Sequence, residues 1–129
     1  QCKSALLIAK FLEQHKKVNQ VNYPGLVSSK SHARGKQFLC GFGGMLSFII
    51  EGGIKTADAF ISKLDIPIST ASLGGVESLI TRPVQTSHSL LSDEELELAG
   101  IDKSLIRMSV GIESVNDLID DISQALDSI

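Results

Sequence analysis

Apolar residues recur along this chain at two different spacings, and the order of those spacings restricts the fold. Repeats of three and four residues predict helices at residues 4–17, at residues 54–64 and from Ser114 onward. Extended apolar runs that predict strands lie at residues 18–23, 45–51, 68–71, 77–81 and 105–112. Because these elements do not follow a regular βαβ alternation, we predict an α+β fold. Its sheet is expected to be mostly antiparallel, with about four strands and with helices packed on one face.

Several short signals set the expected boundaries of these elements. Ser92 followed by Glu95 has the spacing of a capping box, and Gly100 is suited to the left-handed position that ends a helix. The pair Pro24-Gly25 predicts a turn after the first strand. The polar residues 28–35 are expected to form a loop.

Length and composition are those of one globular domain. A chain of 129 residues with 43% hydrophobic residues can bury a core without disulfides or metals, so residues 1–129 are expected to be a single domain. The first residue is Gln1, and a helical pattern begins almost at once. We therefore expect the chain to be a piece of a longer protein.

Charge and cysteine content argue against several classes of partner. The net charge of −3, with basic residues scattered along the chain, makes a nucleic-acid partner unexpected. No run of 18 apolar residues predicts a membrane span, and the first residues lack the charged-then-apolar profile expected of a signal peptide. Cys2 and Cys40 lack a C-x-x-C spacing, and the histidines lie far apart, so no metal site is expected. A cytoplasmic location fits best.

The run at residues 105–112 contains the strongest candidate for a binding residue. Strict alternation places Ile106, Met108, Val110 and Ile112 on one face of a strand and Arg107 on the other, exposed face. The planar guanidinium of an arginine matches a carboxylate through two parallel hydrogen bonds. From the pattern alone, however, a surface salt bridge is the commoner role of such an arginine.

Two further segments could line a site. Ser72-Leu73-Gly74-Gly75 has small residues that let backbone N–H groups approach an anion, although two adjacent glycines are more often a simple turn. Ser87-His88 could also face a ligand, but a loop histidine is more often solvated. No serine lies in a G-x-S-x-G sequence, so a hydrolase triad has no support.

Several separate motifs, taken together, resemble one known family. They are residues 72–80, Pro83, residues 87–88, residues 100–101 and residues 105–113, with weaker likeness at residues 23–25, 41–45 and 117–121. In order and spacing they resemble the C-terminal domain of the cystathionine γ-synthase and γ-lyase family. This is the Cys/Met-metabolism group of pyridoxal-phosphate enzymes. The resemblance covers essentially the whole chain.

The resemblance implies a role for particular residues. The fold would be the small C-terminal domain of a fold-type I pyridoxal-phosphate enzyme, in which Arg107 binds the substrate α-carboxylate and Ser72 lies beside it. Ala71, Leu73, Ser87 and His88 would line the pocket. No catalytic residue is implied in this chain, because none of its lysines lies in the family's cofactor-lysine motif.

The resemblance also implies what surrounds the chain. A larger upstream domain would hold pyridoxal phosphate, so the isolated chain is expected to bind no cofactor and to be inactive. The expected partners are an amino-acid substrate, the chain's own N-terminal domain and further copies in a homo-oligomer, typically a tetramer.

Three positions bear on the substrate. Ala71 stands where many members carry Glu, and Ser87 replaces a Thr, which keeps a hydroxyl. Gly75 stands where methionine γ-lyases and acyl-homoserine sulfhydrylases typically carry Asp, which favours the cystathionine branch. The implied reaction is a β/γ-elimination or replacement on sulfur amino acids or O-acylhomoserine. The alternatives are methionine γ-lyase, O-acylhomoserine sulfhydrylase, or a stand-alone anion-binding or oligomerisation module without catalysis.

Overall fold

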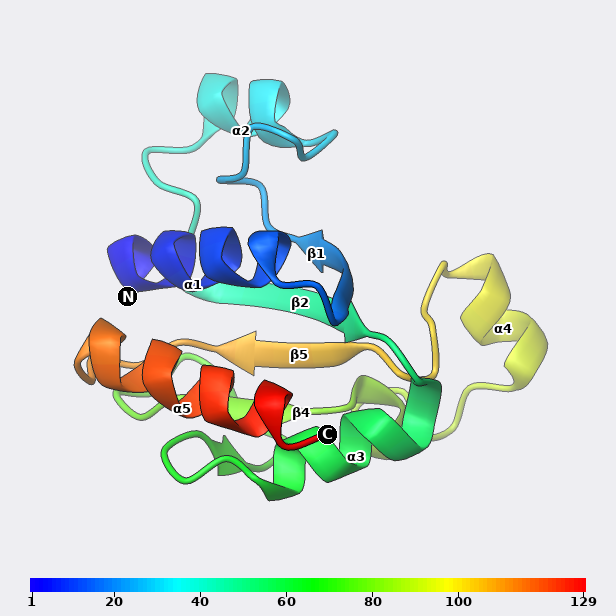
Figure 1. Ribbon diagram of the computed structural model, residues 1–129. Helices are drawn as coiled ribbons and strands as arrows, with labels where there is room; N and C mark the ends of the chain where they lie inside the picture. Colours follow the sequence, from blue (N-terminus) through cyan, green and yellow to red (C-terminus); the bar gives the residue numbers. More distant parts are fainter.

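A five-stranded sheet runs through the middle of the computed structural model, which describes residues 1–129 (Figure 1). The strand order is β1-β2-β5-β4-β3. The bounds are β1 Val18–Asn22, β2 Met45–Ile50, β3 Ile68–Ser69, β4 Leu79–Thr81 and β5 Ile106–Ser109. β5 is therefore the central strand, with β2 and β4 as its antiparallel neighbours.

The sheet is mixed and has five strands, so the prediction of about four, mostly antiparallel strands is wrong. β3 and β4 run parallel, whereas β1 pairs antiparallel with β2. The chain between β3 and β4 folds back as a loop before it enters β4, instead of making a tight hairpin turn. β3 has only two residues, which is too short for its alternation to reveal which neighbour it pairs with.

Three helices cover one face of the sheet, as the sequence predicts. They are α1 Cys2–Gln14, α3 Gly53–Ser62 and α5 Val115–Asp127, and α1 and α5 lie side by side in front of the sheet (Figure 1). α4 Asp93–Leu98 lies outside this layer, and its predicted capping box between Ser92 and Glu95 is confirmed. A short 3₁₀ helix, η1 Pro83–Gln85, follows β4.

The prediction of a loop at residues 28–35 is wrong in its second half. A helix, α2 His32–Phe38, begins there, outside the three-helix layer (Figure 1). The His32 ring stacks on Phe42 with ring centroids 5.3 Å apart, and its Nδ1 lies 2.9 Å from the carbonyl oxygen of Pro24. These contacts are made with residues distant in sequence, so local propensity does not report them.

The hydrophobic core lies between the sheet and its three covering helices. Alternate residues of β2 and β5 point into it and are almost completely buried: Leu46, Phe48, Ile50, Ile106 and Met108. Phe48 meets Phe60 of α3 edge to face, with ring centroids 5.8 Å apart. Full burial of side chains of this size contributes about 1.5–3 kcal/mol each.

β5 is shorter than the predicted strand at residues 105–112. It ends at Ser109, and Ile112 is 69% exposed instead of sharing the buried face. After the strand ends, Gly111 packs so closely against backbone that an added Cβ would collide with the carbonyl oxygen of Val76. No helix in the structure combines the length and the apolarity needed to cross a membrane.

Candidate functional site

Arg107 lies on the sheet face opposite the core, as the alternation of β5 predicts. Its neighbours Ile106 and Met108 are fully buried, whereas Arg107 is partly exposed. In the register of the sheet it stands directly between Ser47 of β2 and Thr81 of β4. Because directly paired residues share a face, two short hydroxyl side chains flank the arginine.

The guanidinium of Arg107 is held only by backbone carbonyl groups. Its NH2 group donates to the carbonyl oxygens of Ala71 and Ser72, at 2.9 and 3.1 Å. Neither of the two salt bridges in the structure involves it. An arginine has five N–H donors, and here Nε and NH1 donate to no protein group. Arg107 therefore keeps both an uncompensated positive charge and free donors.

Residues 71–73 lie in a loop that contacts Arg107, called here the Arg107 loop. It is attached to the sheet at both ends. At its start, the Thr70 amide donates to the carbonyl oxygen of Ile80 at 3.1 Å. At its end, the Gly74 amide donates to the hydroxyl of Ser109 at 2.8 Å. Gly74 has a φ of +77°, a left-handed conformation that favours glycine. Residues 71–73 therefore span the exposed face of β5 between two fixed points.

A row of polar side chains continues from Arg107 toward the edge of the sheet. Asn22 of β1 pairs with Ser47, and its amide donates to the Ser47 hydroxyl at 3.1 Å. Gln20 in turn donates to Asn22 at 2.7 Å. None of these three residues was predicted from the sequence to belong to a site. The signal was available, because Ser47 is the one polar residue inside the apolar run of β2.

A carboxylate fixes the segment that follows the Arg107 loop. Glu113 accepts hydrogen bonds from the Ser78 amide at 2.5 Å and from the Ser78 hydroxyl at 2.8 Å. The Gly111 amide donates to the same hydroxyl at 2.9 Å. Burial raises the pKa of Glu113, but the hydrogen bonds from Ser78 and from the backbone amide of Glu113 itself together outweigh burial and lower that pKa below its ordinary value. The ionised carboxylate thus joins the segment that follows β5 to the residue that precedes β4, and this contact was also not predicted.

The other residues predicted to line a pocket are only partly brought together. Ala71, Ser72 and Leu73 lie in the Arg107 loop and are exposed, with Leu73 at 55%. Ser87 and His88 follow η1 and bond to each other, with 2.8 Å between the Ser87 hydroxyl and His88 Nδ1. No hydrogen bond joins them to Arg107 or to its loop.

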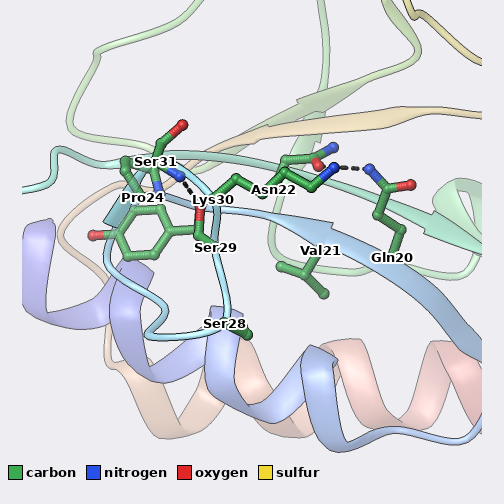
Figure 2. Close-up of a pocket in the computed structure, with 9 residues that line it drawn as sticks. Gln20, Val21, Asn22, Pro24, Ser28, Ser29, Lys30 and Ser31 are labelled. Atoms are coloured by element: carbon green, nitrogen blue, oxygen red, sulfur yellow. Dashed lines mark hydrogen bonds between the residues drawn. The ribbon is translucent and has the colours of Figure 1, made fainter. Parts of the chain in front are cut away.

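Three concavities lie on the surface, and Arg107 lines none of them. The largest, about 620 Å³, lies beside β1 and the segment before α2. Figure 2 shows its polar walls, where Gln20 bonds to Asn22 and the Lys30 side chain points toward both. Arg107 and the loop that contacts it therefore form an open surface in this chain and not an enclosed cleft.

The chain has close relatives among known proteins. It is 46% identical to a cystathionine γ-lyase of Dictyostelium discoideum over 97% of this chain and 32% of that protein. The crystal structure of a cystathionine γ-synthase from Xanthomonas oryzae, in complex with cystathionine, superposes with a TM-score of 0.93 at 42% identity. The superposition covers 97% of this chain and 32% of the Xanthomonas oryzae chain.

A second solved structure contains a pyridoxyl group on a lysine. A Campylobacter jejuni protein assigned as O-acetylhomoserine (thiol)-lyase carries a pyridoxyl-lysine monophosphate at its position 205. It superposes with a TM-score of 0.93 at 38% identity, over 98% of this chain and 30% of that chain. This chain thus spans about a third of the length of the relatives it matches. The model of the Cys/Met metabolism PLP-dependent enzymes matches residues 1–127, so this chain belongs to that family of pyridoxal-phosphate-dependent enzymes.

Proposed function

We propose that this chain is the C-terminal domain of a pyridoxal-phosphate-dependent trans-sulfuration enzyme, and that Arg107 binds the α-carboxylate of its amino-acid substrate. The observation that carries the proposal is the guanidinium of Arg107, which lies on the uncovered sheet face with no internal carboxylate partner. Membership of the family and the motif around Arg107 support it.

The contacts of Arg107 leave its guanidinium able to bind a carboxylate that arrives from outside the chain. Carbonyl oxygens accept hydrogen bonds but carry no net charge, so they orient the guanidinium without neutralising it. An arriving carboxylate gains both charge attraction and charge-assisted hydrogen bonds, which are roughly twice as strong as neutral ones. Ser72 would lie beside the bound carboxylate, since its carbonyl already contacts the arginine.

The residues near Arg107 do not fit pyridoxal phosphate by themselves. Holding that cofactor requires a lysine amine for its aldehyde and donors for its phosphate. Around Arg107 the side chains are the hydroxyls of Ser47 and Thr81. No lysine makes a hydrogen bond or salt bridge to Arg107 or to residues 71–74: the amine of Lys17 binds carbonyls at the end of α5, and that of Lys103 binds Asp93. We therefore assign the cofactor to a larger N-terminal domain, and no catalytic step to this chain.

This assignment determines what we propose for the whole protein. The isolated chain would be inactive, because it would supply substrate binding without the reacting centre. The parent enzyme would be cytoplasmic, would contact this chain through its N-terminal domain, and would assemble as a homo-oligomer, most simply a tetramer. Arg107 would hold the substrate in one orientation and so contribute positioning.

For the substrate, we propose cystathionine or an O-acylhomoserine, with elimination or replacement at Cβ or Cγ. Gly75 favours the cystathionine branch over methionine γ-lyase and O-acylhomoserine sulfhydrylase. Ala71 contributes to the site through its carbonyl group, and its methyl side chain cannot contact the distal amino group of a longer substrate through charge.

Replacement of Arg107 in the full-length enzyme tests the proposal. Arg107→Ala should lower kcat/KM for L-cystathionine by about a hundredfold or more, since it removes charge-assisted hydrogen bonds of about 1.5–3 kcal/mol each. Arg107→Lys should recover only part of this loss, because an ammonium group lacks the planar fork. Arg34→Ala, at an exposed arginine of α2 with no hydrogen bond, is the matched control and should leave kcat/KM unchanged.

Two competitive inhibitors separate carboxylate binding from general damage to the site. L-norleucine has the α-carboxylate, and n-pentylamine is the same molecule without it. Arg107→Ala should weaken inhibition by norleucine but not by pentylamine. An equal effect on both would contradict the proposal. Calorimetric binding of amino acids by the isolated chain would instead favour the stand-alone anion-binding module.

A further inference from the structure

Two side chains of β5 contact the same loop. Arg107 and Ser109 are two residues apart, so both point to the uncovered face of the sheet. Arg107 donates to carbonyl oxygens at the start of the loop, and Ser109 accepts from the amide of Gly74 at its end. β5 thus contacts the loop through two side chains, one near the start of the loop and one near its end.

The hydroxyl of Ser109 fixes where the carbonyls of the loop lie. Ser109 is only 3% exposed, and no other hydrogen bond is made by the Gly74 amide. Residue 70 is already fixed to β4 by its amide. With both ends held, the carbonyls of Ala71 and Ser72 are confined to positions where they can accept from the same NH2 group.

We propose that Ser109 is a positioning residue for substrate recognition, which acts through the loop on the orientation of Arg107. The inference rests on the proposed function of Arg107, but it assigns a separate residue and a separate contact. Ser109 itself need not touch the substrate. Its hydroxyl holds the loop, the loop carbonyls hold the guanidinium, and the guanidinium meets the carboxylate with its free donors already directed.

Loss of the hydroxyl should release this arrangement without disturbing the core. In Ser109→Ala the amide of Gly74 loses its acceptor. The next anchors after residue 70 are then the carbonyl oxygens of Gly75, which accepts from Gln1 Nε2 at 2.7 Å, and Val76, which accepts from the Ile112 amide at 2.8 Å. The free segment is longer, so the carbonyls of Ala71 and Ser72 spread over more positions. Arg107 then has to be ordered when the substrate binds, which weakens binding. Loss of one hydrogen bond corresponds to a decrease in binding affinity of about three- to tenfold.

The experiment compares variants of the full-length enzyme. Ser109→Ala should raise KM for L-cystathionine and Ki for L-norleucine by about three- to tenfold, with a smaller change in kcat and no change in Ki for n-pentylamine. Ser109→Thr keeps the hydroxyl and should restore the norleucine Ki. Ser104→Ala is the matched control, because Ser104 is equally buried and its hydroxyl bonds to Asp102 in a different loop. It should change neither Ki.

A double-mutant cycle tests whether Ser109 acts through Arg107. If it does, the norleucine Ki of the Arg107→Ala/Ser109→Ala enzyme should equal that of Arg107→Ala alone. Fully additive effects, or an equal rise of both inhibitors' Ki in Ser109→Ala, would overturn the inference. The ratio of the two Ki values does not depend on the amount of folded enzyme, so partial misfolding cannot mimic the expected result.

The same measurements distinguish the two proposals. If Arg107→Ala selectively weakens inhibition by norleucine but Ser109→Ala does not, only the positioning role of Ser109 is overturned. If Arg107→Ala fails to discriminate between the two inhibitors, the proposed function itself is overturned.

Discussion

Arg82 donates from Nε and NH2 to the two carboxylate oxygens of Asp58, at 2.7 and 2.9 Å, in a bidentate pair. Its NH1 group donates to the carbonyl oxygen of Lys103 at 2.8 Å. Arg82 is 5% exposed, and the pair joins the end of β4 to α3. Arg107 has no such partner, so the chain contains one arginine committed to the fold and another that is free to bind.

Removal of the carboxylate from this pair should destabilise the protein. Asp58→Ala leaves the buried guanidinium of Arg82 with one protein partner, and donors left unsatisfied in the interior cost about 1–3 kcal/mol. The Asp58 side chain is 46% exposed, which admits water and favours the lower half of that range. Urea denaturation measures the free energy of unfolding.

The surface pair of Lys103 and Asp93 provides the control for this prediction. Both of its side chains are exposed, at 45% and 78%. Lys103→Ala removes that pair but leaves the backbone carbonyl that contacts Arg82. The variant should lose less than about 0.5 kcal/mol. A loss as large as that of Asp58→Ala would show that burial of Arg82 does not matter.

Asp121 of α5 fixes the chain that leaves α3, and its replacement should loosen that segment. Its carboxylate accepts from the amides of Asp65 and Ile66 at 2.9–3.1 Å, although the residue is only 7% exposed. Asp121→Asn should lower the free energy of unfolding by about 1–3 kcal/mol. Hydrogen exchange should accelerate most at those two amides. Asp120→Asn, at the exposed neighbouring position, should stay within about 0.5 kcal/mol and leave the exchange unchanged.

Features that depend on neighbouring residues in the sequence were predicted well. The alternation around Arg107 fixes which face of β5 it occupies, because the side-chain period of a strand is set by the backbone alone. The capping box of Ser92 and Glu95 is equally local, since both partners lie within one helical turn. The covering of one sheet face by α1, α3 and α5 follows from their apolar stripes.

Features that depend on contacts between distant segments were not predicted. Arg82 and Arg107 both lie at or beside strand ends, and only the fold shows that Asp58 is within reach of the first. The parallel pairing of β3 depends on the path of a loop, and α2 depends on packing against Phe42. The sequence likewise gives no indication that Glu113 would hold Ser78 across 35 residues.

The stability of the protein should depend on the ionisation of Glu113 in acid. Its pKa in the folded protein is lowered: burial opposes ionisation, but the hydrogen bonds from Ser78 and from its own backbone amide together favour it more. The carboxylate therefore stabilises the fold above its unfolded pKa of about 4.3, and this contribution is lost as the pH falls through the folded pKa. Glu113→Gln should be less stable at pH 7 by on the order of 1.5 kcal/mol.

The pH dependence distinguishes this effect from a simple loss of packing. Measured by urea denaturation from neutral pH downward, the difference between Glu113→Gln and the unmodified protein should shrink below about pH 4.3. Glu77→Gln, at an exposed residue that makes no hydrogen bond, serves as the control. If the difference for Glu113→Gln stays constant across this range, the carboxylate does not stabilise the fold through its charge.

At the alkaline end, Tyr23 should limit stability. Its hydroxyl donates to the carbonyl oxygen of Gly43 at 2.9 Å or to that of Cys2 at 3.3 Å, which ties the start of α1 to the segment before β2. Burial raises the pKa of Tyr23, and the charge that Cys2 acquires at high pH raises it further. Because the folded pKa lies above the unfolded value of about 10, the stabilisation is complete below that value and is lost as the pH rises through the folded pKa.

Tyr23 is the only tyrosine of the chain, so the tyrosinate absorbance band reports this titration directly. The band should appear at a higher pH in the folded protein than in urea. Tyr23→Phe should cost about 0.5–1.5 kcal/mol at neutral pH, since it loses the hydroxyl but keeps the buried ring. Its deficit relative to the unmodified protein should narrow above pH 10, because phenylalanine has no proton to lose. If the folded and urea-unfolded proteins titrate together, the hydroxyl of Tyr23 is accessible to water and does not join the two segments.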